Sequence, residues 1–282
     1  MIAITGATGQ LGQNTVEALL KIVPASQIVA IVRNPAKADA LTKQGVVVRQ
    51  ADYGDRAALT TALEGVEKLL LISSSEVGQR AAQHRNVIDA AVAAGVKFIA
   101  YTSLLHADKS PLGLHVEHVE TEKMLAESGI PFTLLRNGWY SENYLASAPA
   151  ALEHGVFIGA AGEGKIASAT RADYAAAAAR VVSEEGHAGK VYELAGDNAW
   201  TLSELAAELS KQSGKQVVYQ NLSEADVAAA LKDAGLPEVF ANLLADSDIG
   251  ASKGGLFDDS RTLSKLIGRP TTPIAESVKG IL

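Results

Sequence analysis

The fold is decided by Met1-Ile2-Ala3-Ile4-Thr5-Gly6-Ala7-Thr8-Gly9-Gln10-Leu11-Gly12, where an apolar strand-like run leads through a glycine-rich turn into a helical pattern. Glycines in such a turn let a pyrophosphate approach bare backbone amides at the positive end of a helix. The spacing is GxxGxxG, and a glycine triplet alone is a weak signal because ordinary turns also use glycine. Its place between the first strand and the first helix favours dinucleotide binding by residues 6–12.

Short apolar runs alternate with helical patterns along the first half of the chain. The predicted strands are residues 2–5, 27–33, 46–49, 68–73, 96–102 and 132–136. The predicted helices between them are residues 10–22, 34–45, 55–65, 79–94 and 116–128. Continuous apolar strands separated by helices predict a parallel sheet that is covered on both faces. The fold class is therefore α/β, with a Rossmann-type doubly wound sheet.

The strict alternation ends after Arg136. A glycine-rich stretch at 155–167 precedes an alanine-rich helix at 171–183, and the run 190–195 predicts one further strand of the sheet. From Trp200 onward the pattern is mostly helical, and it includes a capping box of Thr201 and Glu204. We expect a dinucleotide-binding domain over 1–138, to which segments near 171–196 return, and a smaller, mostly helical C-terminal lobe over 139–282 on the substrate side.

The end of the second strand predicts which nicotinamide cofactor is bound. An acid near this position would hold the ribose 2′-hydroxyl, but no Asp or Glu occurs between Gln27 and Ala38. Arg33 and Lys37 can instead meet a 2′-phosphate, which favours NADPH over NADH. The alternative is that Arg33 is a solvated surface residue. Asp52, at the end of the third strand, faces the adenine or forms a plain turn.

Two further segments follow predicted strands at the same edge of the sheet. Ser73, Ser74 and Ser75 could line the cofactor ribose, or their hydroxyls could satisfy their own loop backbone. The segment 137–142 brings an amide, a glycine and two aromatic rings, which suit packing around nicotinamide or packing between lobes. The cofactor-binding candidates of this segment are Asn137, Gly138, Trp139, Tyr140, Ser141 and Glu142.

Composition excludes several classes of function. The net charge of −7 disfavours binding to nucleic acid or to acidic membrane surfaces. The absence of cysteine excludes disulfides and thiolate metal sites and fits a reducing compartment. No apolar run approaches the ~20 residues of a membrane span, so we expect a soluble, cytoplasmic protein without membrane insertion.

Two constellations have competing interpretations. His115 and His118 lie one helical turn apart with Glu122 further along, which superficially suggests zinc. The HExxH pattern is absent, so we expect no metal and assign these polar residues to the solvent face of an amphipathic helix. The glycines within 246–259 could form a mobile flap over substrate, although a simple surface loop is the plainer interpretation.

Five features together resemble the NmrA-like group of atypical short-chain dehydrogenases: the Gly6–Gly12 motif, Arg33, Ser73–Ser75, the segment 128–137 and the following Trp139-Tyr140. The resemblance runs essentially from end to end. Within the group it is strongest to the bacterial type 2 NADPH:quinone oxidoreductases, with triphenylmethane reductase next. It implies an NADPH-dependent, flavin-free reductase of quinones with cofactor contacts in the segments named above.

The sequence departs from the many short-chain dehydrogenases that carry a catalytic Tyr and a Lys four residues later. Leu114 and His118 stand at those two places. A quinone accepts hydride without a dedicated proton donor, so we expect a quinone stacked near Tyr140, with His118 as the one candidate proton donor. The alternative function is an NADP(H)-binding redox sensor without turnover, and a homo-oligomer is compatible with either function.

Overall fold

The computed structural model describes all residues from 1 to 282 and contains a seven-stranded sheet with the strand order β3-β2-β1-β4-β5-β6-β8. Its strands are β1 (Ile2–Thr5), β2 (Ile28–Val32), β3 (Val47–Gln50), β4 (Lys68–Leu71), β5 (Phe98–Leu104), β6 (Phe132–Asn137) and β8 (Val191–Leu194). The pairs β1–β2, β1–β4, β2–β3 and β4–β5 are parallel. The doubly wound α/β fold predicted from the sequence is confirmed, including the late strand at 190–195.

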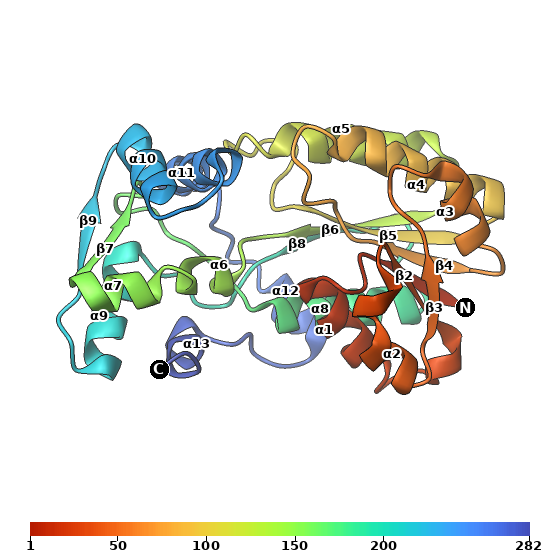
Figure 1. Cartoon of the computed structure of the whole chain (residues 1–282), viewed down its shortest axis with the longest axis horizontal. Coiled ribbons are helices and arrows are strands. Elements are labelled where there is room, and N and C mark those ends of the chain that lie inside the picture. The colour runs from red at the N-terminus through yellow and green to blue at the C-terminus, as the bar shows by residue number, and fades with distance from the viewer. The chain divides into compact units, whose positions relative to one another are not determined.

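The chain divides into two compact units, and the first contains most of the sheet. It comprises Met1–Leu104, Val116–Arg136 and Arg171–Tyr192. Its helices are α1 (Gln10–Leu19), α2 (Asp39–Lys43), α3 (Arg56–Ala62), α4 (Arg80–Ala94), α5 (His115–Glu127, whose first residue belongs to the second unit) and α8 (Arg171–Ser183). Two single 3₁₀ turns, Ala25–Gln27 and Pro35–Lys37, flank β2. Helices α1 and α8 pack on each other on one side of the sheet, and α3, α4 and α5 lie on the other side (Figure 1).

Several helix ends follow the predicted signals. The Asp55 side chain accepts a hydrogen bond from the Ala58 N–H at the start of α3, and Gly95 ends α4 in the left-handed conformation. Asn34 caps only a short 3₁₀ turn before α2. The first helix ends at Leu19, three residues before the predicted end at Ile22.

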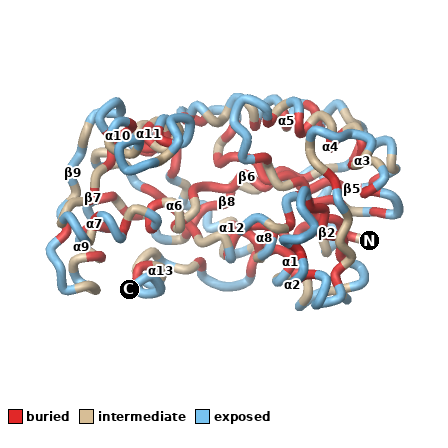
Figure 2. Tube along the Cα trace, viewed as in Figure 1, coloured by how far each residue is buried: buried red, intermediate tan, exposed pale blue.

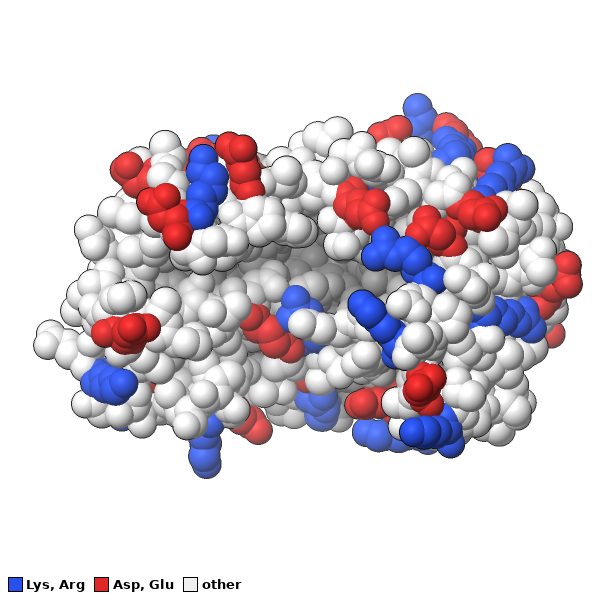
Figure 3. Space-filling model, viewed as in Figure 1, with Lys and Arg blue, Asp and Glu red and all other residues white.

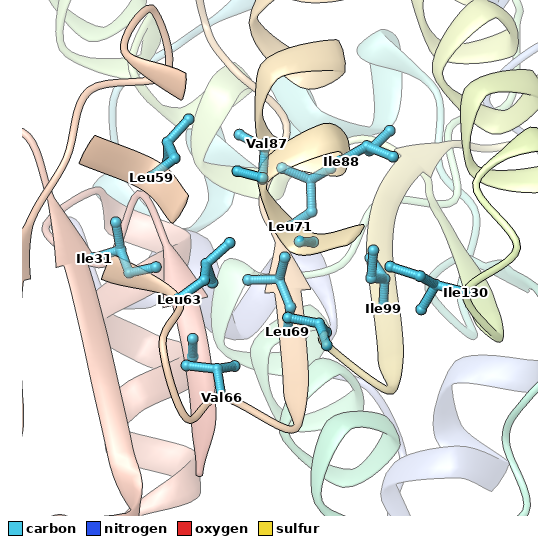
Figure 4. Packing of buried hydrophobic residues seen from close by; sticks show 14 of the residues in the cluster. Ile31, Leu59, Leu63, Val66, Leu69, Leu71, Val87, Ile88, Ile99 and Ile130 are labelled. Carbon is cyan, nitrogen blue, oxygen red and sulfur yellow. The ribbon is translucent and has the colours of Figure 1, made fainter. Parts of the chain in front are cut away.

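The core of the first unit lies between the sheet and helices α3, α4 and α5. Leu59, Leu69, Leu71, Val87 and Ile99 meet there with at most 1% of their surfaces exposed (Figure 4). The edge strands β3 and β8 are half-buried or exposed over most of their length, whereas the central strands are buried and appear red in Figure 2. Burial of both sheet faces explains why these strands are apolar throughout rather than alternating.

The second unit comprises Leu105–His115, Asn137–Thr170 and Glu193–Leu282. Its helices are α6 (Ser141–Leu145), α7 (Ala148–His154), α9 (Leu202–Ser213), α10 (Glu224–Asp233), α11 (Glu238–Ser252), α12 (Thr262–Ile267) and α13 (Ile274–Lys279). The expected capping box of Thr201 and Glu204 is present at α9. The unit also contains a parallel pair that the sequence reading missed, β7 (Val156–Gly159) with β9 (Val218–Asn221). The domain boundary at 138/139 stays a prediction.

None of the helices combines the length and the apolar composition of a bilayer-spanning segment. Acidic and basic side chains are interspersed on the face of the molecule that Figure 3 shows.

Candidate functional site

The glycine-rich turn brings β1 and α1 into backbone contact. Gly6 has a φ of +60°, in the left-handed region that glycine adopts most readily. A Cβ on Gly12 would lie 2.3 Å from the Gly6 carbonyl oxygen and 2.7 Å from Ala7 Cα. Because both neighbours are backbone atoms, no side-chain rotation can relieve that overlap. Glycine at position 12 is therefore required for the helix to start this close to the strand.

The N-terminus of α1 is left open for an anion. Its N-cap residue is Gly9, which has no side chain to cap the helix, and the first turn contains no acidic residue. Gln13 is the first N–H to bond back into the helix, to the Gly9 carbonyl at 2.8 Å. The N–H groups of residues 10–12 precede that donor, and such groups at a helix start bind phosphate.

Arg33 lies immediately after β2, and its guanidinium faces two carboxylates. Nη1 donates to Oε1 of Glu76 at 3.0 Å, and Nε lies 3.9 Å from Oδ2 of Asp52. The Arg33 side chain is 73% exposed. The position that the sequence assigns to the 2′-phosphate therefore holds an accessible cation that is paired with an acid from the loop after β4.

The loop that contains Ser73, Ser74 and Ser75, here called the serine loop, follows β4. Side chains of β5 and α4 accept hydrogen bonds from its backbone. The Ser73 N–H donates to Thr102 Oγ1 at 2.8 Å, and the Ser74 N–H donates to His84 Nε2 at 2.9 Å. The Ser74 hydroxyl is buried, donates to Gln83 and accepts from the Glu76 N–H. Ser74 thus stabilises its own loop, which was the plainer of the two interpretations for it. Ser75 is exposed.

Tyr53 was not predicted as a site residue from the sequence, although it directly follows Asp52, which was considered as an adenine contact. Its hydroxyl donates to the Ile72 carbonyl at 2.7 Å, and a Cβ on Gly6 would lie 3.5 Å from that hydroxyl oxygen. Burial raises the pKa of this phenol well above its ordinary value. Tyr53 therefore closes the space between the glycine turn and the end of β4 as a neutral side chain.

His115, His118 and Glu122 were expected on the solvent face of α5, and for His118 and Glu122 that expectation is wrong, because their side chains are largely buried. His118 and Thr121 are buried, while Val116 is 58% exposed. Polar partners on neighbouring elements hold these inward-facing groups, and Met124 and Leu125 continue the buried face as apolar residues further along the helix. The sequence contained a usable signal, because α4 carries a matching polar stripe at Arg80, Gln83 and His84.

Both ring nitrogens of His118 contact protein groups. Nδ1 lies 2.7 Å from the Tyr101 hydroxyl, and Nε2 lies 3.4 Å from Nη1 of Arg80. Burial, and secondarily the charge of Arg80, hold the pKa of His118 well below its ordinary value. Its role as a proton donor stays a prediction, and this geometry offers a structural role instead.

His84 is likewise a buried histidine whose two ring nitrogens both contact protein groups. Its Nε2 accepts from the Ser74 N–H, and its Nδ1 lies 2.9 Å from Thr121 Oγ1. An imidazole that accepts an N–H bond is unprotonated at that nitrogen. Burial, and secondarily Arg80, lower its pKa to about 3. The serine loop is therefore supported by the neutral form of His84.

Two of the three residues weighed as zinc ligands, Glu122 and His118, have other partners. Glu122 accepts from Nε and Nη2 of Arg136 at 2.9 and 2.7 Å and from the Ser103 hydroxyl at 2.6 Å. His118 bonds to Tyr101, whereas Nδ1 of His115 is buried without a hydrogen-bond partner. Glu122 and His118 are thus engaged with different groups, and no cluster of three or more His, Cys, Asp or Glu side chains is placed to hold a metal ion.

In the second unit, the segment that follows β6 is fixed by backbone hydrogen bonds. The Gly138 N–H donates to the Leu194 carbonyl at 2.7 Å, and the Ser141 N–H donates to the Ala169 carbonyl at 3.0 Å. Trp139 is buried and Tyr140 is partly exposed. Asn137 is buried, and its Oδ1 has no hydrogen-bond partner within the protein.

The stretch 246–259 is only partly a loop, because its first seven residues belong to a helix. Its first residues form the last turns of α11, and Gly254 (φ +81°) ends that helix. A Cβ on Gly255 would lie 2.6 Å from Leu112 Cδ1, and Leu256 is 1% exposed. The two glycines therefore allow a helix end to pack tightly.

The NmrA-like family matches residues 1–268. The chain is 83% identical over 278 residues to quinone oxidoreductase 2 of Escherichia coli, covering 99% of this chain and 97% of that protein. It is 31% identical to an NAD(P)H azoreductase of Xenophilus azovorans, over 99% of this chain and 97% of that one.

Solved structures give the same picture. The NADPH complex of an Escherichia coli NADPH-dependent quinone oxidoreductase has a TM-score of 0.98 at 82% identity, over 100% of this chain and 99% of that chain. The NADP(H) complex of triphenylmethane reductase from Citrobacter sp. has a TM-score of 0.96 at 45% identity, over 100% of both chains.

Proposed function

The chain belongs to the NmrA-like family, and from that premise we propose that it is a flavin-free reductase that transfers hydride from NADPH to a quinone. The observation that carries the proposal is the 83% identity, over nearly the whole of both chains, to a quinone oxidoreductase. That similarity favours turnover over the alternative of a redox sensor that binds NADP(H) without catalysis.

The residues present fit NADPH. The turn at Gly6–Gly12 has room for backbone only, and the uncapped start of α1 suits a pyrophosphate. Arg33 would hold the 2′-phosphate through charge-assisted hydrogen bonds. The unsatisfied buried oxygen of Asn137 would accept a bond from a carboxamide N–H group of the nicotinamide, which removes the penalty of leaving that oxygen unpaired. Ser73, Ser75 and the segment 138–142 would complete the contacts.

When bound, NADPH supplies the hydride, and with one proton from solvent it converts the quinone to the hydroquinone and leaves NADP⁺. The chain's own residues would bind NADPH and the quinone and hold the two rings in the orientation that hydride transfer needs. Near-attack orientation contributes ~7 to 11 kcal/mol in model systems. Because a reduced quinone is a phenolate-like anion, water can protonate it, and the chain needs no counterpart of the missing Tyr/Lys pair. Tyr140 would provide the aromatic wall for the acceptor ring.

The proposal is tested by anaerobic single-turnover kinetics. Purified protein is mixed with NADPH in the presence and absence of a small benzoquinone, and the loss of reduced nicotinamide absorbance is followed. We expect oxidation that depends on the quinone and proceeds without added flavin. Tight NADPH binding without quinone-dependent oxidation would contradict the proposal and favour the sensor. The cytoplasmic location and the homo-oligomeric state stay predictions.

A further inference from the structure

Glu76 is the acid that faces Arg33, the residue proposed to hold the 2′-phosphate. Its Oε1 accepts from Arg33 Nη1 at 3.0 Å, and its Oε2 accepts from Gln83 Nε2 at 2.8 Å. Both carboxylate oxygens are therefore engaged, one of them by the guanidinium that the cofactor requires. The other nearby acid, Asp52, lies at 3.9 Å and accepts a hydrogen bond from the Gly54 N–H.

The backbone around Glu76 keeps the carboxylate in this position. The Glu76 N–H donates to Ser74 Oγ at 3.1 Å, and Ser74 is in turn held by His84 and by Arg80, whose Nε donates to the Ser74 carbonyl at 2.7 Å. On the far side of the loop, the Gly78 N–H donates to Glu117 Oε1 at 3.0 Å. The loop is thus fastened to both α4 and α5, and Glu76 is directed at Arg33 before any ligand arrives.

A 2′-phosphate brings roughly 1.5 to 2 negative charges at neutral pH, by analogy with a phosphate monoester. To bond Nη1 of Arg33 it must displace the Glu76 carboxylate or lie beside it, and both arrangements are unfavourable. A ribose with a free 2′-hydroxyl carries no such charge and meets no such opposition. We propose that Glu76 is a specificity-determining residue that competes with the 2′-phosphate of NADPH for Arg33. This inference rests on the proposed use of NADPH.

The consequence is that Glu76 lowers NADPH affinity selectively. Glu76→Gln keeps the side-chain length and an oxygen for Gln83 but removes the charge. The ion pair is half exposed, at 73% for Arg33 and 45% for Glu76, so the effect of its removal is modest. We expect 2′,5′-ADP and NADPH to bind about three- to tenfold more tightly to the variant. The affinities for 5′-AMP and NADH should change by less than about twofold, because those ligands lack the 2′-phosphate.

The experiment titrates the four ligands into the full-length protein by calorimetry or nicotinamide fluorescence. The matched control is Glu127→Gln, which removes a similarly exposed acid paired with Arg85 at 3.7 Å in the same unit. This control should change no affinity. The difference between the variants should shrink when salt is raised from about 20 mM to about 500 mM, since salt screens exposed charges. Thermal melting shows whether each variant is folded.

The outcomes separate the inference from the function. Unchanged or weaker binding of 2′,5′-ADP by Glu76→Gln, with normal binding by the unmodified protein, would overturn the inference and leave the proposed function standing. Equal gains for 5′-AMP and 2′,5′-ADP would also overturn it, because they would indicate a general rearrangement of the loop. Failure of the unmodified protein to bind either NADPH or 2′,5′-ADP would overturn the cofactor proposal and the inference together.

Discussion

Replacing Gly12 by alanine tests the contact between β1 and α1 directly. The new Cβ would lie 2.3 Å from the Gly6 carbonyl oxygen and 2.7 Å from Ala7 Cα. Carbon atoms pack best at roughly 3.5 to 4.0 Å, so the start of α1 would have to move away from the turn by about 1 Å. Such overpacking costs about 1 to 3 kcal/mol of stability.

The same movement displaces the amides that would hold the pyrophosphate. Each charge-assisted hydrogen bond is worth ~1.5 to 3 kcal/mol, and losing two weakens binding by at least about a hundredfold. Thermal melting and NADPH fluorescence titration measure the two effects. Gly9→Ala is the stability control, because its Cβ would meet only the Gly6 oxygen at 3.2 Å. Wild-type melting and wild-type NADPH affinity in Gly12→Ala would refute the reasoning. A lower melting temperature with normal affinity would place the pyrophosphate elsewhere.

Three further outcomes are expected. Arg33→Ala should weaken NADPH about ten- to a hundredfold and scarcely affect NADH in fluorescence titrations, and equal losses would exclude it as the phosphate ligand. His118→Gln should lower benzoquinone turnover by less than about tenfold while costing about 1 to 3 kcal/mol of stability, because Arg80 and Tyr101 lose a partner; a thousandfold loss of turnover at unchanged stability would identify a general acid. The pKa of His84 is about 3 in the native state and ~6.5 in the unfolded state. As the pH falls below ~6.5, the unfolded state therefore binds a proton that the native state does not bind. Urea denaturation should accordingly show that this group lowers the free energy of unfolding by about 2 kcal/mol at pH 5 relative to pH 7. His84→Gln should lack that increment, and an identical pH dependence in the variant would argue against it.

The sheet could be predicted because its central strands are buried on both faces and the helices beside it carry local end signals. Gly95 after α4 and Thr201 with Glu204 at α9 act through their own backbone neighbourhood, so the sequence alone reveals them. The pair β7–β9 escaped because it forms between segments some 60 residues apart along the chain, and its strand Val218–Asn221 is largely exposed. Nothing local distinguishes such a strand from a loop.

In the candidate site, too, features set by local sequence position could be predicted, whereas contacts between distant residues could not. The glycine turn and Arg33 are defined by their place after β1 and β2, and position in an α/β alternation can be read from sequence. The pairing of Arg33 with Glu76 joins residues 43 positions apart, and the support of the serine loop by His84 depends on α4 facing inward with polar groups. Hydrophobic periodicity cannot predict polar contacts of this kind, because it assumes that the buried side of a helix is apolar.

The first two turns of α5 are consequently inverted in their tolerance to substitution. His118 and Thr121 face inward. Replacing either residue by leucine would make the position apolar but would remove hydrogen-bond partners of Arg80, Tyr101 or His84. Val116 is 58% exposed, so replacing it by lysine should change the stability little. In a saturation scan, positions 118 and 121 would behave as core and position 116 as surface. A substitution score based on hydropathy would rank them in the opposite order.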